Sequence, residues 1–352
     1  MRFLDIPPLD EKAATAARKK IDGLSKPMGS LGRLEEYAVR LAAIRGHAGG
    51  LLGKKAVLVF AADNGVHEEG ITPVPQAVTA SQAKAIANGL AGVSVLAKQA
   101  GADVFVFDVG MARAAEESAI IDCAVMRGTN NMAHGPAMTR EQCEAAVRVG
   151  FDAVKERGEY GALGIGEMGI CNTTTAAAVA CALLGAGPEE MTGLGAGITD
   201  AQYRKKVDTV KKALDVNRPD GRDAIDVLAK VGGLDIAAMA GAFCACACYS
   251  IPAVADGFIS ICAALAAVRM DERVGQVLFL SHKSAEKGYA AIARALGLHA
   301  PMDMGMRLGE GSGCPLMFYL LEAALCITDG MGTLEAAAGI GKENLVDFAA
   351  EE

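Results

Sequence analysis

The sequence predicts an α/β fold in which a parallel sheet is covered by helices on both faces. Apolar runs of four to eight residues alternate with helix-length segments, and runs such as KAVLVFAA at 55–62 and DVFVFDV at 103–109 lack the polar alternation of a half-exposed strand. Glycine and polar residues gather directly after these runs. Open parallel sheets bind ligands at this carboxyl edge, so we expect the functional site there.

Taken in chain order, the pattern predicts the following elements. Strands are expected at residues 55–62, 103–109, 162–165, 252–255 and 276–280. Helices are expected at 8–46 (two segments around the Pro/Gly turn at 25–33), 76–100, 140–157, 173–184, 201–214, 236–249, 259–268, 285–296 and 315–327. Because both ends of the chain depart from the strand–helix alternation, we predict a small helical domain from 1–50 with 315–352 and an α/β domain from 51–314.

Composition excludes several classes of protein. The chain has 352 residues and a formal net charge of −8, which argues against a nucleic-acid partner because such a partner needs a basic surface. The start of the chain lacks the features of a signal peptide, and the longest apolar stretches carry Gly, Pro or Asp, so we expect a cytoplasmic protein without membrane spans. The ten cysteines form no CxxC pair, which favours reduced, buried thiols over disulfides or a metal site.

A single carboxylate stands among three glycines in RLGEGSG at 307–313. Glycine lets a backbone approach a ligand closely, and an apolar helix follows from residue 315, so Glu310 is expected on a tight loop in apolar surroundings. A carboxylate held there is suited to act as a general base. The alternative is an acid at a helix start that the helix dipole stabilises.

A second glycine-rich segment, GIGEMG at 164–169, precedes CNTTT at 171–175. The GxGxxG spacing is that of a dinucleotide site, but Glu189 and Glu190, at the required distance, follow a helix rather than a strand. The hydroxyls and amide at the next helix start favour a phosphate site, with simple N-capping as the alternative. A carboxylate beside a phosphate would be repelled, so we expect Glu167 to meet ribose hydroxyls or a cationic ring.

Two later segments complete the predicted nucleotide site. A glycine loop at 193–200 leads into the basic residues RKK at 204–206, one of which could join the phosphate site, although such residues more often form a solvated helix face. The segment SHKSAEK at 281–287 again places hydroxyls before a helix.

Seven segments together resemble one known family. They are KPMGSLGRLE (26–35), ADNGV (62–66), GEMGICNTT (166–174), KVGGLD (230–235), DGF (256–258), SHKSAEKG (281–288) and RLGEGSG (307–313). In this order they resemble nicotinate-nucleotide–dimethylbenzimidazole phosphoribosyltransferases, which act in cobalamin lower-ligand synthesis. The resemblance implies a Rossmann-like sheet, a small helical domain from both chain ends, a homodimer, and no metal or other cofactor. It also implies transfer of phosphoribose from nicotinate mononucleotide to 5,6-dimethylbenzimidazole, giving α-ribazole 5′-phosphate and nicotinate.

The same resemblance implies residue roles. Glu310 corresponds to the family's base, and Glu167 to a glutamate near the ribose and the reacting centre. The nucleotide phosphate and ribose are assigned to Gly169, Asn172, Thr173, Thr174, Gly195, Lys206 and Ser284. The aromatic base is assigned to Val74, Pro75, Gln82, Met168 and Leu308.

Two positions depart from the family pattern. Asn64 stands where histidine is common, and Val74 stands where a related sequence has a polar serine in the base pocket. The more apolar wall leaves open another aromatic base, such as a substituted benzimidazole or a phenol. A nucleotide-binding module without turnover is the alternative from a different class, and the presence of both Glu167 and Glu310 argues against it.

Overall fold

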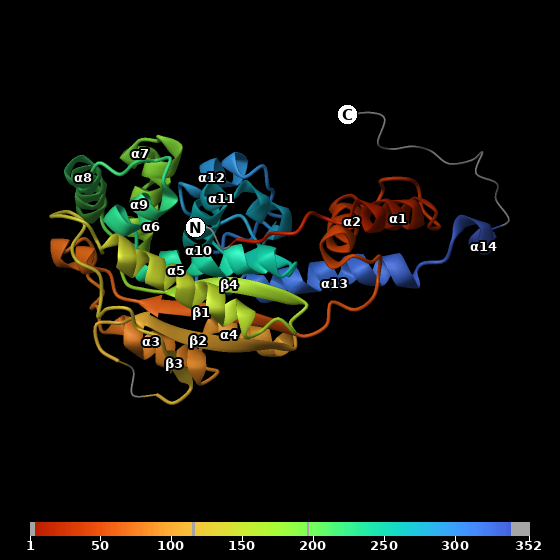
Figure 1. Ribbon diagram of the computed structural model, residues 1–352, viewed down its shortest axis with the longest axis horizontal. Coiled ribbons are helices and arrows are strands. Elements are labelled where there is room, and N and C mark those ends of the chain that lie inside the picture. Colours follow the sequence, from red (N-terminus) through yellow and green to blue (C-terminus); the bar gives the residue numbers. More distant parts are fainter. Residues whose placement is uncertain (1–3, 115–116, 196, 339–352) are drawn as a thin grey trace.

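The computed structural model describes residues 4–114, 117–195 and 197–338 (Figure 1). Within them one parallel sheet has six strands in the order β3-β2-β1-β4-β5-β6. The strands are β1 (Lys55–Ala62), β2 (Ala102–Gly110), β3 (Ile120–Asp122), β4 (Ala162–Met168), β5 (Ala253–Ala255) and β6 (Leu278–Leu280). This order confirms the predicted Rossmann-like α/β fold. All strands are parallel, but their order along the sheet changes direction between β1 and β4.

Helices cover both faces of the sheet (Figure 1). They are α1 (Glu11–Asp22), α2 (Arg33–Arg45), α3 (Val78–Ala87), α4 (Gly92–Gln99), α5 (Arg140–Lys155), α6 (Asn172–Leu184), α7 (Pro188–Met191), α8 (Asp200–Asn217), α9 (Ala224–Val231), α10 (Leu234–Cys248), α11 (Phe258–Met270), α12 (Tyr289–Ala295), α13 (Cys314–Gly330) and α14 (Leu334–Ala338), with 3-10 turns η1 (Gly65–Glu69) and η2 (Glu272–Val277). Helices α3, α4 and α13 lie on one face, and α5 and α10 lie on the other.

The central strand explains why the sheet is covered on both sides. All eight residues of β1 are buried, as its unbroken apolar run requires. Helix α10 packs on β1, β2 and β4 and crosses α5 so closely that a Cβ on Gly150 or Gly241 would collide with the backbone of the opposite helix. Small residues therefore set the thickness of this layer.

Helices from the first and last parts of the chain pack together beside the sheet. Helices α1 and α2 pack together, α2 packs on α13, and the backbone of Leu24 pairs with that of Thr333 (Figure 1). Buried residues of α2 and of the sheet belong to one continuous core. The division into 1–50 with 315–352 and 51–314 stays a prediction, and its residues 1–3 and 339–352 lie outside the described part of the chain.

The structure corrects several predicted boundaries. The helix expected at 76–100 is two helices, because the chain turns at Asn88-Gly89 and Gly89 has a φ of 78°. Strand β4 runs to Met168 instead of residue 165, so Glu167 lies on a strand and not in a loop. The helix expected from 285 begins at Tyr289. Strand β3 and helices α7 and α9 were not predicted, since the first two are only three and four residues long.

No helix in the described ranges has the length and apolar character needed to cross a bilayer.

Candidate active site

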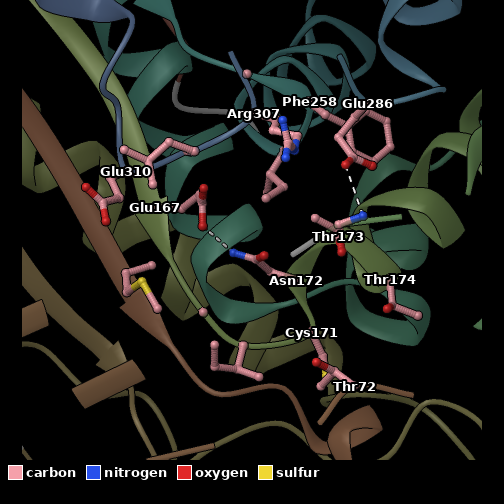
Figure 2. Close-up of a pocket in the computed structure, with 18 of the residues that line it drawn as sticks. Thr72, Glu167, Cys171, Asn172, Thr173, Thr174, Phe258, Glu286, Arg307 and Glu310 are labelled. Carbon is pink, nitrogen blue, oxygen red and sulfur yellow. Dashed lines mark hydrogen bonds between the residues drawn. The ribbon is translucent and has the colours of Figure 1, made fainter. Parts of the chain in front are cut away.

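A cavity of about 400 Å³ opens at the carboxyl end of the sheet (Figure 2). Its walls come from the end of β4, the start of α6, the segment before α3, the loop before α8, the start of α11 and the loop before α13. The predicted residues that line it are Val74, Gln82, Glu167, Met168, Gly169, Asn172, Thr173, Thr174, Gly195, Lys206, Ser284, Leu308 and Glu310. Pro75, predicted for the aromatic base, does not line the cavity.

Glu310 lies on a tight loop, as predicted, with a left-handed backbone at φ 64° between Gly309 at 85° and Gly311 at 86°. Its side chain is buried, and its Oε1 accepts a hydrogen bond of 2.6 Å from Nε2 of Gln82. Its Oε2 is also buried and has no hydrogen-bond partner in the described part of the chain. A buried, unpartnered carboxylate oxygen is costly unless a ligand uses it. Because α13 begins only at Cys314, Glu310 is not the helix-start acid of the alternative interpretation.

Glu167 lies beside Glu310 on the same wall (Figure 2). Its carboxyl accepts a hydrogen bond from the side-chain amide of Asn172. The amide of Asn172 also donates to Oδ2 of Asp235 at 3.1 Å. Burial, and then the neighbouring Asp235, raise the pKa of Glu167 to about 8. This carboxyl is therefore mostly protonated at neutral pH and can donate a hydrogen bond.

Lys206 lies at the other end of the cavity. Its buried Nζ donates to Oγ1 of Thr173 at 2.8 Å and to the carbonyl oxygen of Gly193 at 3.1 Å. Burial lowers its pKa to about 8, against the opposing influence of Glu286. Glu286 in turn accepts a hydrogen bond of 3.0 Å from the backbone N–H of Gly195. This end offers a cation and hydroxyls, which suits an anion.

The start of α6 differs in detail from the prediction. Backbone N–H groups expected to be free are occupied, because those of Asn172 and Thr174 donate to the carbonyls of Gly169 and Cys171. The N-cap is Cys171, with no side-chain capping bond, so the N-capping interpretation of Asn172 or Thr173 is wrong. The dinucleotide interpretation also fails, because Gly164 and Gly166 lie within β4 and not in a phosphate loop.

The remaining wall is apolar. Val74, Met168 and Leu308 line it together with Ile71 and Val78. Leu308 is 60% exposed, which places it at the mouth of the cavity. Of the two departures from the family pattern, Val74 lines this wall. Asn64 is not a lining residue; it is fully buried, and its side-chain amide donates to the carbonyl of Ile170.

Several residues at or near the cavity were not assigned a role from the sequence. Arg307 and Phe258 line it opposite the carboxylates, and Figure 2 shows them near Glu286. Both belong to motifs already noted in the sequence, Arg307 to RLGEGSG and Phe258 to DGF, and this was the available signal. Asp235 and Asp256 lie just behind the wall, and no spacing in the sequence relates them to Glu167 or Glu310.

Comparisons with known proteins agree with this geometry. A family model described as phosphoribosyltransferase matches residues 6–339. The chain is 45% identical over 322 residues to a nicotinate-nucleotide–dimethylbenzimidazole phosphoribosyltransferase of Acetivibrio thermocellus, covering 91% of this chain and 92% of that one. It is 45% identical over 335 residues to the Escherichia coli protein of the same name, covering 94% and 93%. The crystal structure of CobT from Thermus thermophilus superposes with a TM-score of 0.89 at 38% identity, covering 94% of this chain and 99% of that one.

The buried carboxyls predict a stability that falls as the pH rises. Burial raises the pKa of Glu167 to about 8 and those of Asp235 and Asp256 to about 7. Unfolded carboxyls titrate near pH 4, so between about pH 5 and pH 8 the folded protein holds more protons, and its free energy of unfolding should fall by on the order of 1 kcal/mol per pH unit. Glu167→Gln should reduce this slope, because glutamine does not titrate.

Urea unfolding at steps across this pH range measures the slope. Glu189→Gln, an exposed change on α7, serves as the control and should leave the slope unaltered. A free energy of unfolding that is constant or rises with pH, or a slope in Glu167→Gln equal to that of the parent protein, would contradict the assignment. Lys206 acts with the opposite sign only above its pKa of about 8, so it does not mask the effect.

Proposed function

The chain belongs to the nicotinate-nucleotide–dimethylbenzimidazole phosphoribosyltransferase family, and from this premise we propose how its own residues perform the family reaction. The enzyme transfers the 5-phosphoribosyl group of nicotinate mononucleotide to 5,6-dimethylbenzimidazole, for cobalamin synthesis. The products are α-ribazole 5′-phosphate and nicotinate. The observation that carries the proposal is Glu310, a residue of the cavity lining whose buried Oε2 has no hydrogen-bond partner among the described residues.

The two ends of the cavity match the two substrates. Lys206, Thr173 and Ser284 suit the 5′-phosphate, which needs a cation and hydroxyl donors. The apolar wall of Val74 and Met168 suits a flat aromatic ring. Arg307 supplies a second cation at the rim, and nicotinate mononucleotide carries a second anionic group, its ring carboxylate.

The chemistry is a single in-line displacement. One ring nitrogen of the benzimidazole forms a bond to C1′ as the bond from C1′ to nicotinate breaks, and its electron pair returns to the pyridinium nitrogen. The proton on the other benzimidazole nitrogen goes to Oε2 of Glu310. Inversion converts the β-nucleotide into an α-nucleotide, so no enzyme nucleophile takes part. Glu167, mostly protonated at neutral pH, donates to the ribose.

The first test measures release of nicotinate from nicotinate mononucleotide with and without 5,6-dimethylbenzimidazole. Glu310→Gln should lower kcat by about 10²–10⁴-fold, the usual contribution of a general base. Nucleotide affinity, measured by calorimetry, should stay near the parent value because Glu310 lies away from Lys206. The new side chain can still accept the hydrogen bond from Gln82, so the loop should remain folded.

The outcome also separates the alternatives. Near-parental turnover of Glu310→Gln would remove Glu310 as the base. A panel of substituted benzimidazoles and phenols in the same assay identifies the preferred aromatic base. Val74 affects this preference because it makes the wall of the cavity apolar. Nucleotide binding without any nicotinate release would instead indicate a module that does not turn over.

The second test addresses the phosphate end. Lys206→Ala should weaken nucleotide binding by roughly 10- to 100-fold, since a buried charge-assisted contact contributes about 1.5–3 kcal/mol. Lys205→Ala, an exposed change one residue away on α8, is the matched control and should bind the nucleotide normally. Equal affinities of the two variants in calorimetry would take Lys206 out of the phosphate site.

We also propose a homodimer, which the family resemblance implies, with the exposed apolar residues Leu90 and Leu308 in the interface. Leu90 is 78% and Leu308 60% exposed, and Leu308 packs so close to Gly92 that a Cβ there would lie 2.8 Å from it. Sedimentation should give twice the 36.1 kDa chain mass, and Leu90→Asp should shift the population toward monomer. A monomer at micromolar concentration would contradict the proposal.

We also propose a cytoplasmic location, which the ten free cysteine thiols support because disulfides are rare in a reducing compartment.

A further inference from the structure

The loop that carries Glu310 has an unfavourable backbone conformation. Three consecutive residues, Gly309, Glu310 and Gly311, have φ between 64° and 86°. Glycine adopts this region freely, but for a residue with a Cβ it costs roughly 1–2 kcal/mol. Strain of this kind persists only where the surroundings over-determine the conformation, and it gathers at functional sites. The surroundings of this loop therefore need to supply the holding interactions.

Every backbone N–H group from Gly311 to Cys314 has an acceptor. Those of Ser312 and Cys314 donate to carbonyls within the loop, at 3.0 Å each to Gly309 and Gly311. The other two, at Gly311 and Gly313, donate to one side chain.

That side chain is Asp256, the residue directly after β5. Its Oδ2 accepts from the N–H of Gly311 at 3.1 Å, and its Oδ1 accepts from the N–H of Gly313 at 2.6 Å. Successive N–H groups around an anion form a nest, and such a nest fixes the path of the backbone. Asp256 thus holds the loop on the C-terminal side of Glu310 through two hydrogen bonds.

Asp256 is itself held in place. It is 2% exposed, its N–H donates to Oγ of Ser260 at 3.1 Å, and its carbonyl accepts from Oγ of Ser281 at 3.0 Å. The space beside it is filled, because a Cβ on Gly313 would lie 2.8 Å from its Oδ1 and 2.6 Å from Oγ of Ser281. A carboxylate held rigidly after the end of β5 can therefore fix the position of the loop relative to the sheet.

We propose that Asp256 is a positioning residue that holds Glu310 in its left-handed conformation and so aims the carboxylate at the aromatic base. Asp256 does not line the cavity, and it acts on the reaction only through the loop. The inference rests on the proposed function, in which Glu310 accepts the proton.

The test compares two buried aspartates at strand ends. Asp256→Asn leaves one acceptor oxygen and turns an NH₂ group toward a loop N–H. One of the two hydrogen bonds that hold the loop is therefore lost. Asp108→Asn is the control, because Asp108 near the end of β2 is equally buried and also accepts from two backbone N–H groups, those of Gly110 at 3.0 Å and Met111 at 2.7 Å, yet lies outside the cavity lining. Unlike Asp256, it receives both bonds at Oδ1, while its Oδ2 pairs with Arg127.

Asp256→Asn should lower kcat by about 10²-fold, the cost of a misplaced catalytic group, with nucleotide affinity in calorimetry unchanged. Asp108→Asn should keep kcat within about twofold, because distant sites act independently. Hydrogen exchange of the loop 309–313 should accelerate in Asp256→Asn and not in Asp108→Asn. A general loss of stability would instead lower kcat or binding in both variants.

A kcat for Asp256→Asn equal to that of Asp108→Asn would overturn the inference. If Asp256→Asn does not fold, amide hydrogen exchange is measured in the parent protein instead. Strong protection of the Gly311 and Gly313 amides would support the role of Asp256 in holding the loop. Exchange as fast as in an exposed loop would overturn it. Failure of the proposed function is distinguishable, because it would show as full activity of Glu310→Gln. Loss of activity in Glu310→Gln alone overturns only the role of Asp256.

Discussion

The close packing of the loop 309–313 on strand β4 is the constraint on which the rest of the site depends. A Cβ on Gly166 would lie 2.5 Å from the amide nitrogen of Gly311, and a Cβ on Gly311 would lie 2.6 Å from Cγ1 of Val57 on β1. No side chain fits between these backbones, so glycine is required on both sides. This contact brings Glu310, from the end of the chain, beside Glu167 in the middle of the sheet.

The same packing brings four buried acidic side chains into one region. The two ends of the cavity therefore differ in charge. Burial raises the pKa values of Glu167, Asp235 and Asp256, so part of the negative charge is neutralised by protons instead of by cations. Backbone N–H groups and the Asn172 amide satisfy much of the remainder. Lys206 stands apart at the opposite end, where the nucleotide phosphate is proposed to bind. A site of this form can take a neutral aromatic base and an anionic nucleotide together without a metal in the proposed chemistry.

The success of sequence analysis differed between elements for physical reasons. Strand β1 was predicted from end to end because every residue in it is buried and all but the first are apolar. Strand β4 was predicted too short, because Gly164 and Gly166 have the appearance of a loop in the sequence. They are tolerated in the strand because Cys314 and Gly311 pack directly on them. The prediction of a single helix at 76–100 was wrong because the chain turns at Gly89, and this turn interrupts an otherwise continuous helical pattern.

The sequence by itself determined the fold class, the family resemblance and the identity of the two carboxylates in glycine-rich motifs, because apolar periodicity and local motifs are short-range properties. Only the tertiary structure decided how they meet: that Glu167 belongs to a strand, that Asn172 links it to Asp235, and that Pro75 lies outside the cavity. It also disclosed the contact of Asp256 with a loop more than fifty residues away. Such contacts arise where strand ends from separate parts of the chain converge at one edge of a parallel sheet, and no local pattern encodes that convergence.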